Sequence, residues 1–546
     1  MFLLMESKIL TVGVLSLLIL NIIFIELPSP NMNRNLIKEI SIISNKMSSV
    51  SHDSIRIHNN SDFINQAASN GWPGNGSKTN PYVISGYDID ACGGDYGIEI
   101  DNTSVYFVIK NCTVSNTTKN GYGIYFWGVM HGRVENNNIS GNWEGIFLEN
   151  SVNNTIIGNT IYGNYEGLCL GESSDNNLIS DNDITQNTWD GLSIYYSTTN
   201  IIKNNTISNN SKYGVYLRGA AKITIANNTI SNNWEGVFEE SSSNCSFIDN
   251  TLTNNYEGMG LGASADNNFI SCNHIALSTW DGISIYYSSH NRIENNTLSS
   301  NHKYGIYMNG SSNNKILNNT ISMSWEGIFL DSSTHNTIVS NEILHNYEGM
   351  GLGASSDDNF ILRNRITFNT WDGISIYYST GNILKNNTIL DNNKYGIYLQ
   401  STVGCIIVKN NISNNSDYGI YINESRNIII YRNIFFYNHG STNTFDSLHI
   451  QAYDNGINNY WNSSEGIGNY WEDWANNNDT NDQNGDGIVD WPYKIDGSAD
   501  AKDYCPLKST SETIPEFPYG LWIVILVIII LKLDFPKVLF INKNKR

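Results

Sequence analysis

The feature that most constrains this chain is a short phrase that returns along most of its length. The phrase is x-Gly-apolar-x-apolar, and most of its steps are 22–24 residues long. Its glycines are Gly97, Gly123, Gly145, Gly167, Gly191, Gly214, Gly236, Gly258, Gly282, Gly305, Gly327, Gly349, Gly373, Gly396 and Gly419. A second mark, an asparagine two places before an apolar residue, repeats with the same period. It stands at Asn137, Asn159, Asn182, Asn205, Asn228, Asn250, Asn273, Asn296, Asn319, Asn341, Asn364, Asn387, Asn410 and Asn433. Two marks that share one period indicate a structural repeat.

Each repeat contains short stretches, such as GIFL and NTIIGNTI, in which apolar and polar residues alternate between Asn, Ser and Gly turns. Alternation over about four residues predicts β-strands. A unit of short strands and turns forms one coil of a solenoid, and stacked coils pair their strands in parallel. We therefore predict an all-β fold, a right-handed parallel β-helix that forms a single-stranded solenoid of about fifteen coils of 22–24 residues. The asparagine column is expected to form a structural ladder of side-chain hydrogen bonds, with left-handed turn geometry favouring Asn.

A longer period of 91 residues overlies the coil repeat. Four coil types begin with WEG, YEG, WDG and KYG, and each type returns in the same order. The set starts at Trp143, Tyr165, Trp189 and Lys212, then at Trp234, Tyr256, Trp280 and Lys303, and then at Trp325, Tyr347, Trp371 and Lys394. This pattern predicts three duplicated four-coil cassettes from about residue 137 to residue 409.

Apolar runs mark both ends of the chain. Lys8 precedes the run Ile9–Ile25, and Leu521–Leu531 is followed by a basic tail. Such runs predict a signal peptide or signal anchor and a C-terminal anchor or sorting segment, and hence an extracellular or cell-surface protein held at the membrane. The expected segments are 1–27 (signal peptide or anchor), 28–70 (linker and N-terminal cap), 71–440 (β-helix), 441–507 (C-terminal cap), 508–518 (linker) and 519–546 (hydrophobic anchor with basic tail).

Composition narrows the possible partners. The net charge is −21 although only 15% of residues are charged, which argues against nucleic-acid backbones and suits cations or neutral sugars. About twenty Asn-x-Ser/Thr sequons, for example at Asn75, Asn102, Asn204 and Asn318, fit a secreted glycoprotein. The seven cysteines are scattered and form no CxxC motif, so we expect isolated buried thiols rather than disulfides or a zinc site.

Residues 71–507 resemble the NosD-type periplasmic copper-binding β-helix family, also grouped as carbohydrate-binding and sugar-hydrolase repeats. The resemblance lies in the opening GWPGNGSKTNPYVISGYDIDACGGDYGIEI, in the YGIYL and NNTI coils, and in the closing GNYWEDW and NGDGIVDWPYKIDG. The segment IPEFPYG resembles an archaeal PEF-type C-terminal sorting signal. The resemblance implies the fold but leaves the activity open, because members of the family do many things.

The segment DQNGDGIVD resembles a short calcium loop. Side-chain oxygens at alternate positions and one carbonyl around a tight glycine turn can converge on Ca²⁺. The candidate ligands are Asp482, Asn484, Asp486, the carbonyl of Ile488, and Asp490. Tyr493 stands where an EF-hand has glutamate, so we predict a structural calcium site with an acidic surface turn as the alternative.

A column of aromatic and acidic residues precedes the repeated glycines. Exposed aromatic faces beside carboxylates suit a polysaccharide or glycan ligand, whereas aromatic residues that pack on one another would only stabilise the coils. Carboxylates stacked in register must reach water, bind cations or share protons. The candidate carbohydrate-binding residues are Trp143, Glu144, Tyr165, Glu166, Trp189, Asp190, Trp234, Glu235, Tyr256, Glu257, Trp280, Asp281, Trp325, Glu326, Tyr347, Glu348, Trp371 and Asp372.

Two other functions remain open from the sequence. A polysaccharide lyase, glycoside hydrolase or epimerase would use paired carboxylates, but the acidic column supplies such pairs everywhere and no catalytic residues stand out. A NosD-like copper accessory role would need converging soft ligands, and the ten histidines do not repeat in register. Glu239 takes an inward place that Ile or Leu fills in sister coils, which predicts a local bulge or a functional acid.

Overall fold

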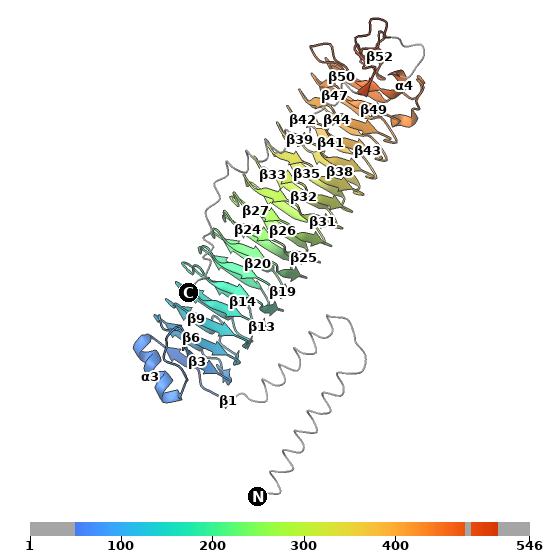
Figure 1. Cartoon of the computed structure of the whole chain (residues 1–546). Coiled ribbons are helices and arrows are strands. Elements are labelled where there is room, and N and C mark those ends of the chain that lie inside the picture. Colours follow the sequence, from blue (N-terminus) through green and yellow to red (C-terminus); the bar gives the residue numbers. More distant parts are fainter. Residues whose placement is uncertain (1–49, 476–481, 511–546) are drawn as a thin grey trace, which may run out of the picture. The chain divides into compact units, whose positions relative to one another are not determined.

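The computed structural model describes residues 50–475 and 482–510, which form two compact units, residues 50–188 and residues 189–510. Both units are built from coils with three short strands, so that three parallel sheets run through each (Figure 1). We call them the first, second and third sheet, in the order in which the chain visits them within a coil. This arrangement confirms the predicted parallel β-helix.

In the first unit, the first sheet is formed by one strand from each successive coil. Its strands are β2 (Ile55–Ile57), β5 (Tyr96–Asp101), β8 (Tyr122–Trp127), β11 (Glu144–Glu149) and β14 (Glu166–Leu170). The second sheet has β3 (Tyr82–Ser85), β6 (Phe107–Lys110), β9 (Gly132–Glu135), β12 (Thr155–Ile157) and β15 (Leu178–Ser180). The third has β1 (Val50–Ser51), β4 (Tyr87–Asp90), β7 (Thr113–Ser115), β10 (Asn138–Ser140), β13 (Thr160–Tyr162) and β16 (Asp183–Thr185).

The second unit continues the same pattern with more coils. Its first sheet has β17 (Leu192–Tyr195), β20 (Tyr213–Arg218), β23 (Glu235–Glu240), β26 (Glu257–Leu261), β29 (Ile283–Tyr286), β32 (Tyr304–Asn309), β35 (Glu326–Asp331), β38 (Glu348–Leu352), β41 (Ile374–Tyr377), β44 (Ile397–Gln400), β47 (Ile420–Arg426) and β50 (Ala452–Ile457). Its second sheet has β18 (Ile201–Lys203), β21 (Thr224–Ala226), β24 (Ser246–Ile248), β27 (Phe269–Ser271), β30 (Arg292–Glu294), β33 (Lys315–Leu317), β36 (Thr337–Val339), β39 (Phe360–Leu362), β42 (Ile383–Lys385), β45 (Ile406–Val408) and β48 (Ile429–Tyr431). Its third sheet has β19 (Thr206–Ser208), β22 (Thr229–Ser231), β25 (Thr251–Thr253), β28 (His274–Ala276), β31 (Thr297–Ser299), β34 (Thr320–Ser322), β37 (Glu342–Leu344), β40 (Arg365–Thr367), β43 (Thr388–Leu390), β46 (Asn411–Ser413), β49 (Ile434–Phe436) and β51 (Tyr470–Trp471).

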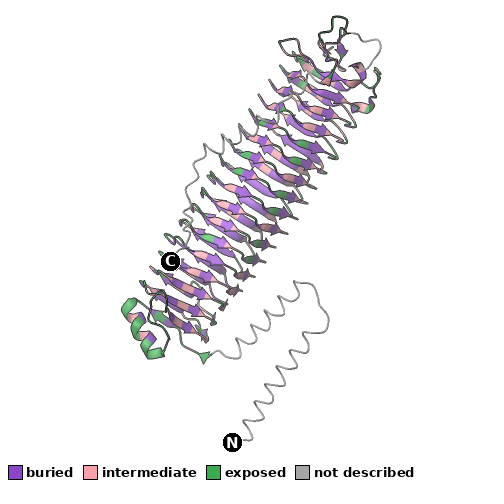
Figure 2. Ribbon diagram, viewed as in Figure 1, coloured by how far each residue is buried: buried purple, intermediate pink, exposed green. Residues whose placement is uncertain are grey.

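The core of each unit consists of apolar columns that run from coil to coil (Figure 2). Ile230 of β22 pairs with Leu252 of β25, which pairs with Ile275 of β28, and all three side chains are fully buried. In β22 and β25, alternation sends the flanking threonines and serine outward, where they are partly or fully exposed. Burial of every inward side chain therefore stabilises the stack along its whole length.

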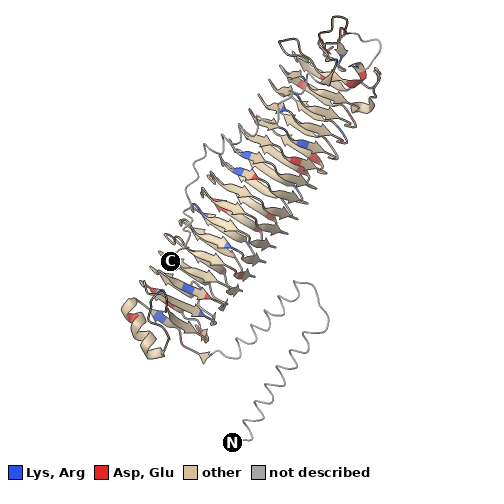
Figure 3. Ribbon diagram, viewed as in Figure 1, with Lys and Arg blue, Asp and Glu red and all other residues tan. Residues whose placement is uncertain are grey.

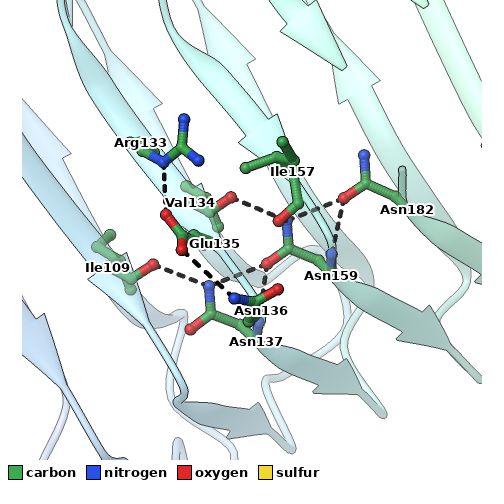
Figure 4. Close-up of polar contacts among 9 residues, drawn as sticks. All are labelled: Ile109, Arg133, Val134, Glu135, Asn136, Asn137, Ile157, Asn159 and Asn182. Carbon is green, nitrogen blue, oxygen red and sulfur yellow. Dashed lines mark hydrogen bonds and ion pairs between the residues drawn. The ribbon is translucent and has the colours of Figure 1, made fainter. Parts of the chain in front are cut away.

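The predicted asparagine column is a continuous buried ladder within each unit, shown for the first unit in Figure 4. The side-chain Nδ2 of Asn137 donates to Oδ1 of Asn159 at 3.0 Å and to the carbonyl of Ile109 at 3.0 Å, and Asn159 repeats the pattern with Asn182. The left-handed backbone belongs to the preceding residue instead, for example Asn136 at φ 55°. The sequence analysis assigned both roles to one position, whereas the structure divides them between two neighbours.

Both ends of the described chain carry elements that differ from the coils. The helix α3 (Asn60–Asn70) buries Phe63 against Tyr82 and Phe107, with ring centroids 5.3 and 5.1 Å apart. At the other end lie η1 (Asn438–Gly440), α4 (Glu472–Ala475) and the antiparallel pair β52 (Tyr493–Lys494) and β53 (Lys502–Asp503). There Trp471 stacks on Tyr493 at 4.1 Å and both side chains are fully buried.

Several predictions concern residues outside this description or need correction. Segments 1–27 and 519–546, which carry the predicted signal and anchor, and the PEF-type motif all lie outside the described residues. Within the described ranges, no helix is both long and apolar enough to cross a membrane. The thiols of Cys92 and Cys272 are exposed and that of Cys505 is half-buried, so the expectation of buried thiols holds only for Cys112, Cys169, Cys245 and Cys405.

Candidate functional site

The predicted aromatic column lies at the corner before the first sheet, and its rings stack on one another. In the second unit Trp234 stacks on Tyr256 with centroids 4.1 Å apart, and Tyr256 lies 6.0 Å from Trp280. The next cassette repeats this order with Trp325, Tyr347 and Trp371 at 4.1 and 5.7 Å. In the first unit Trp143 stacks on Tyr165 at 3.8 Å. We call the sets in the second unit, Trp234–Tyr256–Trp280 and Trp325–Tyr347–Trp371, the indole stacks.

A lysine covers the last ring of each indole stack. The ammonium of Lys303 lies 4.2 Å from the ring centroid of Trp280, and that of Lys394 lies 3.8 Å from the centroid of Trp371. Lys212 covers Trp189 at 4.2 Å in the same manner. In each of these cation–π contacts, the lysine ammonium covers one face of the indole ring. The first indoles, Trp234 and Trp325, keep 51% and 52% of their surface exposed, against 37% for Trp280 and 38% for Trp371.

The acids that accompany the aromatic residues do not extend into water. Asp190, Asp281, Asp372, Glu166 and Glu348 are buried. Glu144, Glu235, Glu257 and Glu326 are half-buried. Charged residues are sparse along the strands of both units (Figure 3). Of the three outcomes expected for stacked carboxylates, burial removes the one in which they reach water.

The aspartates of this column connect one coil to the next. Asp281 accepts a hydrogen bond from the backbone N–H of Tyr304 at 3.2 Å, and Asp372 accepts one from Tyr395 at 3.0 Å. Asp372 also accepts from the hydroxyl of Ser375 at 3.2 Å. The aspartates therefore have a structural role in ordering the start of the following coil.

The glutamates lie in pairs on neighbouring strands. Glu235 is the register partner of Glu257, and Glu326 is that of Glu348. Glycine in the second coil makes room for them: a β-carbon at Gly351 would come within 2.7 Å of Oε2 of Glu326. Oε2 of Glu326 and Oε1 of Glu348 are buried without a hydrogen-bond partner.

Burial is the main cause that raises the pKa of these carboxyl groups. It raises the pKa of Glu144 and Glu235 to about 7. For Glu326 burial acts first and repulsion from Glu348 second, and the pKa reaches about 8, while that of Glu348 rises to about 7. The pKa of Glu257 lies well above its usual range for the same reason, with added repulsion from Glu235 and Asp281. At neutral pH Glu326 and Glu257 are therefore mainly protonated, whereas Glu144, Glu235 and Glu348 titrate near pH 7.

Glu239 occupies the inward position that the sequence analysis singled out, and it lies inside the core of β23 between Leu217 and Leu261. Its side chain is fully buried; Oε1 accepts a 2.5 Å hydrogen bond from Asn268, and Oε2 has no partner. Burial raises its pKa well above the usual range, so the group is a neutral acid. Its position excludes contact with a ligand on the surface.

The predicted calcium ligands lie in one turn. The backbone N–H groups of Asp486 and Gly487 donate to the two carboxylate oxygens of Asp482 at 3.1 and 3.0 Å. Asp490 accepts from the N–H of Gln483 at 2.9 Å. Across the described ranges, no three His, Cys, Asp or Glu side chains gather into a group suited to a metal ion. Calcium at this turn, where an amide and a carbonyl would complete the ligands, stays a prediction.

A cavity that the sequence analysis did not predict lies at another corner of the second unit. Its volume is about 460 Å³, and Phe368, Asp391, Asn414 and Tyr437 contribute to its lining. Two of these residues are joined, because Asn414 donates a hydrogen bond to Asp391. None of the predicted carbohydrate-binding residues lines this cavity.

Comparison with known proteins identifies the family. The model of the right-handed beta helix region matches residues 96–252, 213–352 and 305–473, and the chain belongs to this family. The match supplies the handedness of the solenoid, but it does not distinguish the NosD type. No curated protein matches the sequence.

Solved structures with similar folds include two epimerases and a tailspike. The A-module of the mannuronan C-5 epimerase AlgE6 from Azotobacter vinelandii is 12% identical over 61% of this chain and 89% of its own, with a TM-score of 0.35. The periplasmic alginate epimerase AlgG is 14% identical over 71% of this chain and 84% of its own, with a TM-score of 0.30. The Dettilon tailspike protein is 15% identical over 61% of this chain and 62% of its own, with a TM-score of 0.29. These similarities concern the fold alone.

Proposed function

We propose that this chain is an exported β-helix protein of the cell surface that binds carbohydrate. The observation that carries the proposal is the half-exposed first indole of each indole stack, Trp234 and Trp325. Each stacks on its tyrosine neighbour, and no lysine ammonium covers it among the described contacts, so that an apolar ring face is presented to solvent. Export and anchoring rest on the apolar runs at the two ends of the sequence.

The chain offers a matched control for testing this proposal. Trp234→Ala combined with Trp325→Ala removes the two exposed indoles, whereas Trp280→Ala combined with Trp371→Ala removes indoles that lie between a tyrosine and a lysine. We expect the wild type to bind on a glycan array or to sediment with insoluble polysaccharides. The first double variant should bind more weakly than the wild type, and the second should bind as the wild type does. Absence of wild-type binding, with and without Ca²⁺, would refute the proposed function.

A second candidate function is an enzyme that acts on polysaccharide. It is favoured by the pair Glu326 and Glu348, whose raised pKa values suit a general acid at neutral pH. The test is release of reducing ends or epimerised residues from polysaccharide by the wild type and its loss in Glu348→Gln. Product that persists in this variant would remove the pair from consideration.

We further propose that Asp482, Asn484, Asp486, the carbonyl of Ile488 and Asp490 hold a structural Ca²⁺. Four of these groups present side-chain oxygens from alternate positions around Gly485 and Gly487, which have φ values of 72° and 82°. Oxygen ligands spaced in this way suit a hard cation of this size. Titration of the purified protein with Ca²⁺ while its thermal unfolding is followed tests the proposal, because an ion that binds only the folded state must raise the unfolding temperature.

A further inference from the structure

A row of three tyrosines, which lies outside the residues discussed so far, occupies one corner of the second unit. Tyr196, Tyr287 and Tyr378 each follow directly after a first-sheet strand, β17, β29 and β41. They are 91 residues and four coils apart, which is about 19 Å at the usual spacing of parallel strands. Their exposed fractions are 57%, 66% and 62%, so each ring is presented mainly to solvent. We call them the tyrosine row.

Stability alone does not explain tyrosine at this corner. The φ angles of Tyr196, Tyr287 and Tyr378 are 49°, 50° and 49°, in the left-handed region that disfavours L-residues with large side chains. Four sister coils place serine at the same corner, namely Ser241, Ser264, Ser332 and Ser355, and a further coil places Glu424 there. Each cassette therefore retains a residue that costs conformational energy and leaves apolar surface in water. Strain that persists in this way points to a function.

The corner that holds Leu277 and Phe368 serves as a comparison for the tyrosine row. Leu277 and Phe368 also stand 91 residues apart in the left-handed region, at φ 59° and 57°, and both are about half exposed. Their residue type differs between the cassettes, whereas tyrosine is kept at all three places of the tyrosine row. The tyrosine hydroxyl and ring are therefore the retained features, rather than bulk at a corner.

At two of the three rings, a glycine of the next coil leaves room for the ring. A β-carbon at Gly219 would lie 2.5 Å from Cδ1 of Tyr196, and one at Gly310 would lie 2.6 Å from Cδ1 of Tyr287. Each ring therefore lies against the backbone of the next coil. The third copy differs, because Ser401 of the next coil stands where Gly219 and Gly310 stand in the other two copies.

The coils that follow each tyrosine carry a polar residue and then an acid, in the same order at all three places. The backbone N–H of each tyrosine donates to the carbonyl of Arg218, Asn309 or Gln400 in the next coil, at 2.9, 2.9 and 3.0 Å. The side chain of that residue is paired with an acid. The pairs are Arg218 with Glu240 at 3.8 Å, Asn309 with Asp331 at 3.0 Å, and Gln400 with Glu424 at 2.9 Å. Each place thus combines an exposed aromatic ring with a polar residue one coil on and an acid two coils on.

We propose that the tyrosine row binds a linear, neutral polysaccharide, with one sugar stacked on each ring. This rests on the proposed function and assigns it a second, separate surface. Three like sites at a fixed interval suit a ligand that itself repeats, and tyrosine supplies rigid amphipathic contact area at low entropic cost. The net charge of −21 disfavours an anionic polymer. A protein partner is disfavoured because the rings lie about 19 Å apart, without the continuous apolar patch that such interfaces use.

The test compares three variants by affinity electrophoresis in gels that contain mannan, laminarin, hydroxyethyl cellulose or alginate. The first replaces all three tyrosines by the serine of the sister coils (Tyr196→Ser, Tyr287→Ser and Tyr378→Ser). The matched control, Leu277→Ser with Phe368→Ser, relieves the same backbone strain and removes similar exposed surface elsewhere. The third is the Trp234→Ala and Trp325→Ala variant. Circular dichroism and urea unfolding confirm that each variant is folded.

We expect the wild type to be retarded by at least one neutral polymer and not by alginate. The tyrosine variant should lose at least tenfold in apparent affinity, because three linked weak contacts disappear together, while the control stays within twofold. Full retardation of the tyrosine variant with loss in the tryptophan variant would overturn the tyrosine row and leave the proposed function standing. A wild type that no polymer retards would refute both. Binding of a protein that needs the three tyrosines, without binding of any polymer, would also overturn the polysaccharide assignment.

Discussion

Removal of one buried acid should change how the stability of this protein depends on pH. Glu326 is the choice, because its pKa is raised to about 8 and its Oε2 lacks a hydrogen-bond partner in the fold. Its neighbours on adjacent strands are Tyr304 and Glu348, and Lys303 lowers its pKa only as a minor influence. Glu326→Gln keeps the shape of the protonated side chain and removes the titration.

The sign follows from proton binding by the folded and unfolded states. The folded pKa of about 8 exceeds the ordinary value of 4.5, so the folded state binds more protons between these two values. Stability is therefore fully present below pH 4.5 and is lost as the pH rises, by about 1.4 kcal/mol per pH unit. Between pH 4.5 and pH 7 the loss from this group amounts to about 3 kcal/mol. The variant lacks this loss, so its advantage over the wild type should grow by about 3 kcal/mol over the same range.

The assay is denaturant unfolding at pH 4.5, 5.5, 7 and 8, followed by tryptophan fluorescence. Glu342→Gln is the control, because Glu342 is an exposed acid on β37 whose contact with Arg365 at 3.8 Å contributes little. The control should run parallel to the wild type throughout. If Glu326→Gln also runs parallel, the carboxyl group of Glu326 is ionised in the fold and its raised pKa is wrong.

Three further changes test other parts of the structure. Glu239→Leu gives β23 the leucine that sister coils have at Leu148 and Leu330. It should raise the free energy of unfolding by about 1–2 kcal/mol at pH 7, because a buried carboxyl oxygen without a partner is removed. An unchanged or lower free energy of unfolding would contradict the burial of Glu239. Asn319→Ala removes four ladder hydrogen bonds, with Asn296, Ile293 and Asn341, and should lower the free energy of unfolding in urea by about 3 kcal/mol. The control Asn318→Gly, at φ 53°, should change the free energy of unfolding by less than about 0.5 kcal/mol. Asp486→Ala should abolish the rise in unfolding temperature that Ca²⁺ gives the wild type, and a rise that survives would place the ion elsewhere.

The fold was predictable because its causes lie within one coil and then repeat. Alternation in stretches such as β22 and β25 fixes which side chains face inward, and the asparagine period fixes where one coil rests on the next. The second buried ladder, Asn142 with Asn164, was missed although its period is the same. In each repeat this ladder stands five residues after the first, so the signal was present in the sequence.

The chemistry of the site was less predictable, because exposure depends on neighbours in other coils. Sequence spacing placed Glu326 and Glu348 in one column, but the burial that protonates them comes from the packing around β35 and β38. The same applies to the indoles: Trp234 and Trp280 are equivalent in the repeat, yet Lys303 covers Trp280. For Tyr287, the residue type and its 91-residue period were visible in the sequence. Its left-handed backbone and the contact of its ring with Gly310 became visible only in the fold. In a solenoid the sequence thus predicts which residues share a column, and the neighbouring coils decide which members of the column a ligand can reach.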